Sequence, residues 1–491
     1  MQKADTPIKS SKNLLKKWLK QRLIVEKLNN PVGYLLLCFV ALVVSYIFGT
    51  QGLRTGLIFF AGVILLPTLA LSLFHLPFGI SLLVLSFFII IPLKKFIPAI
   101  QWELAIDLLS GTLLLGLIVQ KVPLKLHGIG PVSFMLGTWI VYSCVLLLTP
   151  FLPKSDYLFF AFRELSVILL IYFLLARGIR TLKLLHSLSI SLILISFLCA
   201  CYGLYQHFFG LLPHEYKWLY GEESHYALLF DTGKLRICSI LQDPSVFGIL
   251  MSCMSLFSYV FIVEGKLSNP YKVLLSIAAI VMLIAMVFSG TRTALLIIPV
   301  GLFFHTFLSL RKKTIVAVST VGAVGLLFLL LFPSTEITKR ISHTLRWVKA
   351  KKYEVLIEQH TYIQPFIKNH PFGNGMGKTA FWEKKVHEVG DKKILPENGY
   401  ALIALETGWI GLFIYCSLLF ISLKMGVERY FSQKSSSVRY YYSAYLLLIF
   451  GIIIANFTQV VLVQYPMNIL FLLGISVLTQ LPKWEQAETT D

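Results

Sequence analysis

Apolar runs of about 18 residues or more recur along almost the whole sequence. A helix of about 20 apolar residues crosses a hydrocarbon core about 30 Å thick, because each residue adds about 1.5 Å. Of the 491 residues, 56% are hydrophobic and only 14% are charged, which is far less charge than a soluble domain of this size exposes. The sequence lacks the ten-residue alternating segments of a transmembrane barrel. The chain is therefore expected to be an all-α, polytopic membrane protein.

The runs predict about fourteen spans, or about 12–14 transmembrane helices, with a long and partly helical loop before the last of them. Only His75 and Leu76 separate the second and third runs, so a hairpin or a re-entrant pair is an alternative there. The predicted spans are residues 31–49, 53–74, 77–93, 102–120, 130–150, 156–177, 184–209, 244–264, 270–289, 292–309, 314–332, 396–422, 438–461 and 464–481.

These spans divide the chain into five parts. Residues 333–395 hold twelve Lys/Arg against six Asp/Glu, which favours an anionic partner, and their arm 343–367 predicts an amphipathic helix. The parts are a basic N-terminal segment (1–30), a transmembrane bundle (31–332) with an outer loop at 210–243, a long loop (333–395), the C-terminal spans (396–481) and a tail (482–491).

The net charge of +20 is dispersed over the loops, which indicates positive-inside topology and contact with anionic lipids rather than a nucleic-acid partner. If the N-terminus is cytoplasmic and successive spans cross in alternate directions, most Lys/Arg of the short loops lie on the cytoplasmic side. Lys94 and Lys95 are exceptions, because they fall on the outer side. Both long loops then fall outside the cytoplasm, and both termini fall inside. Residues 1–30 suit an amphipathic helix on an anionic leaflet or a solvated basic tail. The seven cysteines lie mostly in apolar runs, as small hydrophobic residues do.

Three arginines stand out from this apolar background. Arg163 lies about two turns inside a span, where an ionisable residue is a functional candidate or the partner of a neighbouring carboxylate. Arg236 precedes Pro244, which can begin a helix that Asp243 suits as N-cap. A guanidinium beside a helix N-terminus suits a phosphate, or else a lipid headgroup. Arg292 opens a span on the same side, so the three arginines together predict an anion site.

The long loop ends in a glycine-rich segment. Gly373, Gly375 and Gly377 occupy alternate positions, which favours either close backbone approach to a sugar or phosphate, or a plain tight turn. Their spacing is not that of a nucleotide-binding P-loop.

Glu397 and Asn398 follow at the mouth of the next span. A carboxylate at this position is either a general base or a helix cap. His370 and His387 are alternative bases in the same loop. No metal-ligand spacing occurs in the sequence, so no metal and no other cofactor is expected.

The order of these motifs resembles the O-antigen ligase and Wzy-type O-antigen polymerase superfamily, which are GT-C-like bacterial transferases of lipid-linked glycans. The resemblance covers roughly residues 155–425. The similar parts are Arg163, RxxSxxxDPxxFG at 236–248, SGTRTALL at 289–296, HPFGNGMG at 370–377 and ENGYALIALETGWIG at 397–411.

The resemblance implies transfer of a glycan from an undecaprenyl-pyrophosphate carrier to a hydroxyl of a glycan or lipid-core acceptor. The reaction would occur on the periplasmic face of the bacterial inner membrane, without a metal or a nucleotide sugar. Arg163, Arg236 and Arg292 would bind the pyrophosphate. The ligases have a histidine base before the asparagine, where this chain has Glu397, so the resemblance favours a polymerase-type member. Glu397 and Asn398, with His370 as a substitute base, are the expected catalytic residues.

A flippase of lipid-linked oligosaccharides, or another polytopic transporter, is the alternative. Transporters commonly show internal repeats and polar residues at several midplanes. In this sequence the polar residues gather toward one side and one loop is about 60 residues long, which favours the enzyme.

Overall fold

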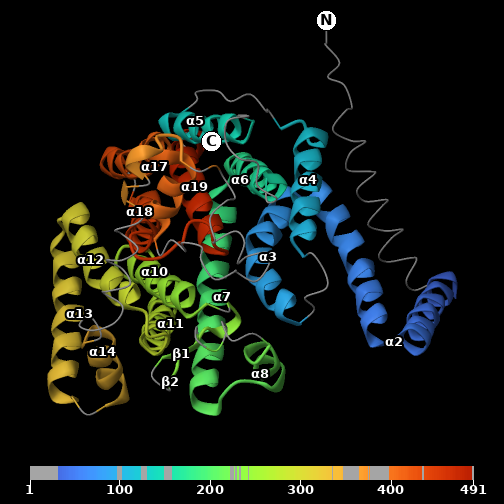
Figure 1. Ribbon diagram of the computed structural model, residues 1–491, viewed down its shortest axis with the longest axis horizontal. Helices are drawn as coiled ribbons and strands as arrows, with labels where there is room; N and C mark the ends of the chain where they lie inside the picture. The colour runs from blue at the N-terminus through green and yellow to red at the C-terminus, as the bar shows by residue number, and fades with distance from the viewer. Residues whose placement is uncertain are drawn as a thin grey trace, which may run out of the picture. The chain divides into compact units, whose positions relative to one another are not determined.

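The computed structural model of the chain is built almost wholly of helices (Figure 1). The chain divides into two units, Met1–Leu71 and Ser72–Asp491. The structure describes residues 31–96, 102–122, 130–148, 158–221, 226, 229–231, 234–241, 243–333, 335–346, 364–365, 367–373, 375, 398–433 and 436–488.

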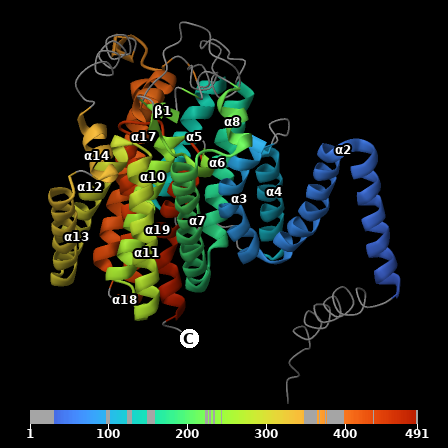
Figure 2. The ribbon, with the colours of Figure 1, turned by 90° about the horizontal axis from the view of Figure 1, so that it is seen from below.

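A single helix, α2 (Pro31–Phe74), covers both of the first two predicted spans. Its 44 residues correspond to about 66 Å at about 1.5 Å per residue, which is more than twice the thickness of a hydrocarbon core. A straight helix of this length does not fit one crossing, and Figure 2 shows α2 bent into two arms.

Each of the remaining predicted spans overlaps one long helix. Within the described residues, seven helices are long and apolar enough to cross a membrane, namely α3, α7, α10, α11, α12, α17 and α18. The prediction of an all-α polytopic membrane protein is confirmed. The long helices of the second unit are α3 (Leu76–Phe96), α4 (Glu103–Val119), α5 (Pro131–Leu148), α6 (Leu158–Gly178), α7 (Leu182–Phe209), α10 (Pro244–Val263), α11 (Asn269–Phe288), α12 (Arg292–Ser309), α13 (Lys312–Leu331), α17 (Gly399–Ser432), α18 (Ser436–Ala455) and α19 (Met467–Glu488).

Helix α10 is the most deeply buried of these membrane-length helices, and it packs against α7, α11, α12 and α18 (Figure 2). Phe247, Phe257 and Phe261 are fully buried along it. The Ser252 hydroxyl is satisfied by the carbonyls of Gly248 and Ala294, at 3.0 and 2.8 Å. A helix that is apolar on every side belongs in the interior of a bundle, and α10 fits this description.

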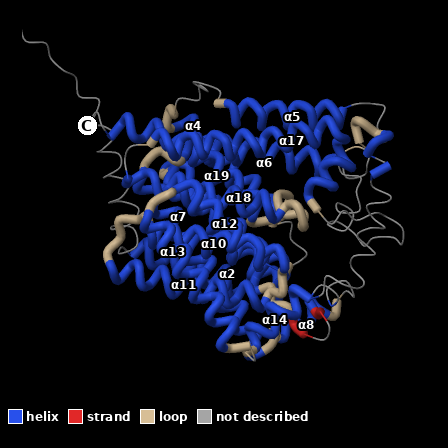
Figure 3. The backbone as a smooth tube through the Cα atoms, turned by 90° about the vertical axis from the view of Figure 1, so that its left-hand side faces the viewer, coloured by secondary structure: helices blue, strands red, loops and turns tan. Residues whose placement is uncertain are grey.

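The two long connections carry short elements of their own. Between α7 and α10 lie α8 (Pro213–Leu219), a two-stranded antiparallel hairpin of β1 (Phe230–Asp231) and β2 (Lys234–Leu235), and the 3₁₀ turn η2 (Ser239–Leu241). After α13, α14 (Glu336–Arg346) begins the long loop. Figure 3 shows the strands as the short red segments near α8. The expected helix over 343–367 is described only at its two ends, and residues 347–363 lie outside the described part.

Candidate functional site

Arg236 lies against the turn between α11 and α12. Its Nε donates to the carbonyl oxygen of Ser289 at 3.0 Å, and its Nη2 lies 3.5 Å from Thr291 Oγ1. Gly290, between these residues, has a φ of +66°, and a Cβ there would stand 3.4 Å from Arg236 Nε. Glycine therefore gives the turn its shape and lets the guanidinium lie on it. The structure thus joins the sequence motifs at 236–248 and 289–296.

The same turn is fixed to the start of α10. The Thr291 hydroxyl donates to the carbonyl of Pro244, the first residue of α10, at 3.0 Å. The Ser289 hydroxyl donates to the carbonyl of Met286, within α11, at 2.7 Å. A Cβ on Gly248 would lie 2.3 Å from Ser289 Oγ, so only glycine permits this approach. Asp243 caps α10 by accepting from the Ser245 amide at 2.7 Å, which confirms the cap interpretation.

Arg292 is the first residue of α12 and is half-buried. Within the described part of the chain, no side-chain hydrogen bond or ion pair of Arg292 is found. The first amides of a helix have no partner inside the helix, and α10 and α12 both begin at this turn. At α10 the Asp243 carboxylate already accepts from the Ser245 amide, so the N-terminus of α12 with the two guanidiniums is the part that can hold an anion.

Arg163 lies instead with a carboxylate on a neighbouring helix. Its Nε and Nη2 are 2.7 and 2.6 Å from Asp107 Oδ2, which joins α6 to α4. Both side chains are mostly buried, with 23% and 29% of their surface exposed. Between described residues, no hydrogen bond connects this pair to Arg292. The observed contacts of Arg163 are thus those of an arginine paired with a neighbouring carboxylate, which was one of the two alternatives. A role of Arg163 in an anion site stays a prediction.

The start of α17 is anchored to the turn that follows α18. The Gly399 amide donates to the carbonyls of Asn456 and Gln459, at 3.0 and 3.2 Å. A Cβ on Gly399 would lie 2.0 Å from Asn456 Oδ1, so glycine is required. Thr293 and Thr458 share a hydrogen bond, which fixes α12 to the same turn. The segments that begin α12 and α17 therefore meet through residues 456–459, a contact that the sequence did not reveal.

Asn398 is the N-cap of α17, since its Oδ1 accepts from the Ala401 amide at 2.7 Å. Glu397 precedes it in the chain but lies outside the described residues, as do His387 and Gly377. His370 is described and exposed.

The glycine-rich segment packs on a bend in α17. Gly408 breaks the helical conformation with a φ of +69°, and a Cβ there would stand 1.9 Å from the carbonyl oxygen of Pro371. The approach is equally close from the other side, because a Cβ on Gly373 would stand 2.6 Å from the amide nitrogen of Gly408. The Gly375 amide donates to the carbonyl of Glu406 at 3.1 Å. These glycines permit backbone packing within the protein, so the tight-turn interpretation describes their contacts.

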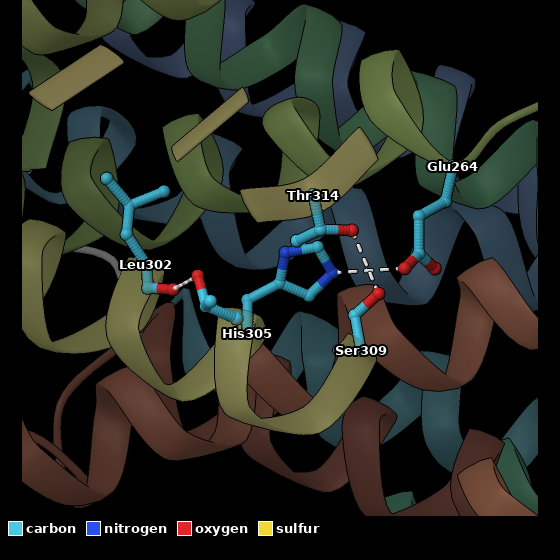
Figure 4. A network of polar contacts seen from close by, with 6 residues as sticks. Glu264, Leu302, His305, Ser309 and Thr314 are labelled. Carbon is cyan, nitrogen blue, oxygen red and sulfur yellow. Dashed lines mark hydrogen bonds and ion pairs between the residues drawn. The ribbon is translucent and has the colours of Figure 1, made fainter. Parts of the chain in front are cut away.

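A second polar cluster occupies the far part of α12 (Figure 4). His305 Nε2 is 3.2 Å from Glu264 Oε1, and the two side chains are 0% and 4% exposed. The hydroxyls of Ser309 and Thr314 share a hydrogen bond of 2.8 Å. Thirteen residues separate His305 from Arg292, or about 20 Å along a helix. Sequence reasoning missed this cluster, and also Asp107, although an ionisable residue inside an apolar run is the signal for both.

The fold and this polar end of the bundle define an all-α, polytopic membrane protein with a candidate anion site at one end. Residues 277–416 match the family model described as O-Antigen ligase (Wzy_C). This match confirms the predicted resemblance to the O-antigen ligase and Wzy superfamily. The matched stretch contains Arg292, the glycine-rich segment and the start of α17, while Arg163 and Arg236 precede it. No curated protein matches the chain.

Proposed function

We propose that the protein transfers a glycan from an undecaprenyl-pyrophosphate carrier to a sugar hydroxyl on the periplasmic face of the bacterial inner membrane. The observation that carries this proposal is the position of Arg236. Its guanidinium lies on the turn at Ser289, which leads into Arg292 and the N-terminus of α12 within the stretch that matches the O-antigen ligase family. Polymerase-type transfer is favoured over ligation because Glu397 stands where the ligases have histidine.

Arg236 and Arg292 bind the pyrophosphate of the donor in this proposal. The Nε–H of Arg236 donates to the Ser289 carbonyl, which orients the guanidinium on the turn. A guanidinium can bind phosphate oxygens through several N–H groups at once. Negative charge grows on the pyrophosphate as it leaves, and preorganised donors at a low-dielectric boundary stabilise that charge. Arg163 is the third arginine of the proposed pyrophosphate site, and it shares its guanidinium with Asp107.

The reaction is a displacement at the anomeric carbon. The acceptor hydroxyl oxygen forms a bond to that carbon, and the bond from the carbon to the phosphate oxygen breaks. The electron pair of the broken bond leaves with the lipid pyrophosphate. A base takes the proton of the hydroxyl, and direct attack inverts the anomeric centre.

Glu397 is the proposed base, with His370 as the alternative. The cap at Asn398 and the bonds of Gly399 to residues 456–459 fix the start of α17 beside α12. Glu397 is the residue immediately before this cap in the sequence. Asn398 uses its oxygen in the cap, and its amide N–H groups are the proposed donors to substrate.

The test is glycan transfer by the purified full-length protein in lipid nanodiscs, with a polyprenyl-pyrophosphate-linked repeat unit as donor. Arg236→Ala should lower the transfer rate about 100-fold or more, and Arg236→Lys should recover only part of it, because lysine lacks the fork of N–H donors. Arg311→Ala is the matched control, since Arg311 is exposed just beyond the far end of α12. Undiminished transfer by Arg236→Ala would refute the pyrophosphate site.

The envelope glycans of a deletion strain separate the possible roles. Single repeat units in place of polymer indicate a polymerase, while normal polymer retained on its carrier indicates a ligase. Loss of lipid-linked units from the periplasm indicates a flippase, and this result would overturn the proposal.

A further inference from the structure

Four aromatic side chains form a row along the connection between α7 and α10. The ring centroids of Tyr216 and Tyr220 are 6.3 Å apart, those of Tyr220 and Tyr226 are 6.4 Å apart, and those of Tyr226 and Phe230 are 4.7 Å apart. The interplanar angles are 13°, 23° and 14°, so successive rings are close to parallel. We call these four residues the aromatic row.

The three tyrosines of the row are open to the surroundings. Tyr216, Tyr220 and Tyr226 are 42%, 70% and 46% exposed. Phe230, by contrast, packs on a small apolar cluster beneath the row, formed by Leu211, Leu219, Leu229 and Cys238. The cluster therefore anchors the last ring of the row, and the three tyrosines extend from it as a stack of exposed rings.

The row leads directly to the candidate pyrophosphate site. Phe230, its last member, pairs with Leu235 across the hairpin, and the Arg236 amide donates to the Leu229 carbonyl at 2.8 Å. Arg340, on α14, donates to the Leu235 carbonyl at 2.8 Å. The hairpin thus carries the end of the row on one strand and leads into Arg236 from the other.

We propose that the aromatic row is a binding subsite for the glycan chain of a lipid-linked substrate. This inference rests on the function proposed above. A pyranose ring presents C–H groups on its face, and these are attracted to the negative face of an aromatic ring, as the positive edges of neighbouring rings are. The three phenol groups add hydrogen-bond donors and acceptors at the border of the stack.

Two features favour a sugar chain over a lipid as the occupant. A linear glycan repeats one ring after another, as the row does, and each sugar offers both an apolar face and hydroxyl groups. The row also ends beside Arg236, so a glycan whose pyrophosphate lies at Arg236 has its first sugars next to Phe230. An acyl chain offers no partner for the three tyrosine hydroxyls.

The experiment measures binding of free oligosaccharide, released by mild acid from the surface polysaccharide of the source cells, to the full-length protein in nanodiscs. The double variant Tyr220→Ala and Tyr226→Ala should bind about tenfold more weakly, because two stacking faces are lost. The double variant Tyr220→Phe and Tyr226→Phe keeps the rings and should bind within about threefold of the unchanged protein. Tyr271→Ala is the matched control, since Tyr271 is 64% exposed and lies in the first turn of α11, away from the α11–α12 turn.

Equal affinity in all variants, or no binding to the unchanged protein, would overturn the proposal and leave the rings as membrane-interface residues. If the double alanine variant does not fold, Tyr220→Ala alone serves, because this ring is 70% exposed. The measurement uses no pyrophosphate and no catalysis. If the protein binds the oligosaccharide through these rings but shows no glycan transfer, the transferase function is refuted and the proposed subsite is supported.

Discussion

Arg163 and Asp107 form an ion pair in which two nitrogens of the guanidinium lie 2.6 and 2.7 Å from one carboxylate oxygen. The pair joins α6 to α4, two helices that are apolar over most of their length. A charged side chain inside the hydrocarbon region is costly unless it is paired, and the carboxylate supplies the missing charge. Arg163 therefore needs Asp107 for stability, whatever its part in substrate binding.

Replacement of Asp107 by asparagine should destabilise the protein, because it leaves Arg163 charged and without its counter-ion. We expect a loss of about 1–3 kcal/mol, visible as a lower midpoint of thermal unfolding in detergent. Glu103→Gln is the control on the same helix, since Glu103 pairs with Lys94, whose side chain is 38% exposed, and should cost less. An unchanged midpoint in Asp107→Asn would show that the pair contributes nothing.

The sequence was sufficient for most of the fold, because each apolar run long enough to cross a bilayer is a helix. It was insufficient where a helix continues through a bend. Nothing in the apolar pattern distinguishes α2, which is one helix, from two spans with a short turn. The pattern also places no break at Gly408, because the residues on both sides of the bend are equally apolar. Such bends depend on contacts with distant segments, as Gly408 shows with Pro371.

Gly408→Ala should be strongly destabilising. The backbone there has a φ of +69°, and the new Cβ would lie 1.9 Å from the Pro371 carbonyl oxygen, so the glycine-rich segment has to move. Strain of this conformation alone costs about 1–3 kcal/mol, and the displacement adds to it. Both the yield of folded protein and the rate of glycan transfer should fall.

Gly322→Ala is the matched control for this substitution. Gly322 lies inside α13 with no atom within 4 Å of the position of a Cβ. Alanine at such a site should stabilise the helix by about 0.5–1 kcal/mol. If Gly408→Ala unfolds at the same temperature as Gly322→Ala, the packing of α17 on the glycine-rich segment is not as described.

Asn398 has a helix-capping contact and a predicted catalytic role, and two substitutions separate them. Asn398→Asp keeps an oxygen for the Ala401 amide and should retain the thermal stability, while Asn398→Ala should lose about 0.5–2 kcal/mol. A residue that acts only as a cap would leave Asn398→Asp fully active. If the amide N–H groups bind substrate, Asn398→Asp should stay folded and lose transfer activity about tenfold or more.

The candidate site was predicted in its residue types and only partly in its contacts. Arg236 and Arg292 were expected on one side, and the structure brings their segments together because Gly248 and Gly290 permit close backbone packing. The partner of Arg163 was not foreseen, since Asp107 lies 56 positions away in an ordinary apolar run. Contacts between distant helices depend on how the helices are arranged, and hydropathy does not encode that arrangement.

Glu264 and His305 should matter for stability and not for the proposed transfer. They tie the end of α10 to α12 about 20 Å from Arg292, and both side chains are almost fully buried. Glu264→Gln keeps the size of the side chain but removes its charge, and His305→Ala leaves the carboxylate buried without this partner. Each should lower the free energy of unfolding by about 1–3 kcal/mol, and the double variant should cost less than the sum of the two. The checks are thermal unfolding and the KM for the lipid-linked donor, which should be unchanged in the folded variants. Additive losses would show that the two side chains do not interact, and a raised KM would place this cluster in the substrate path.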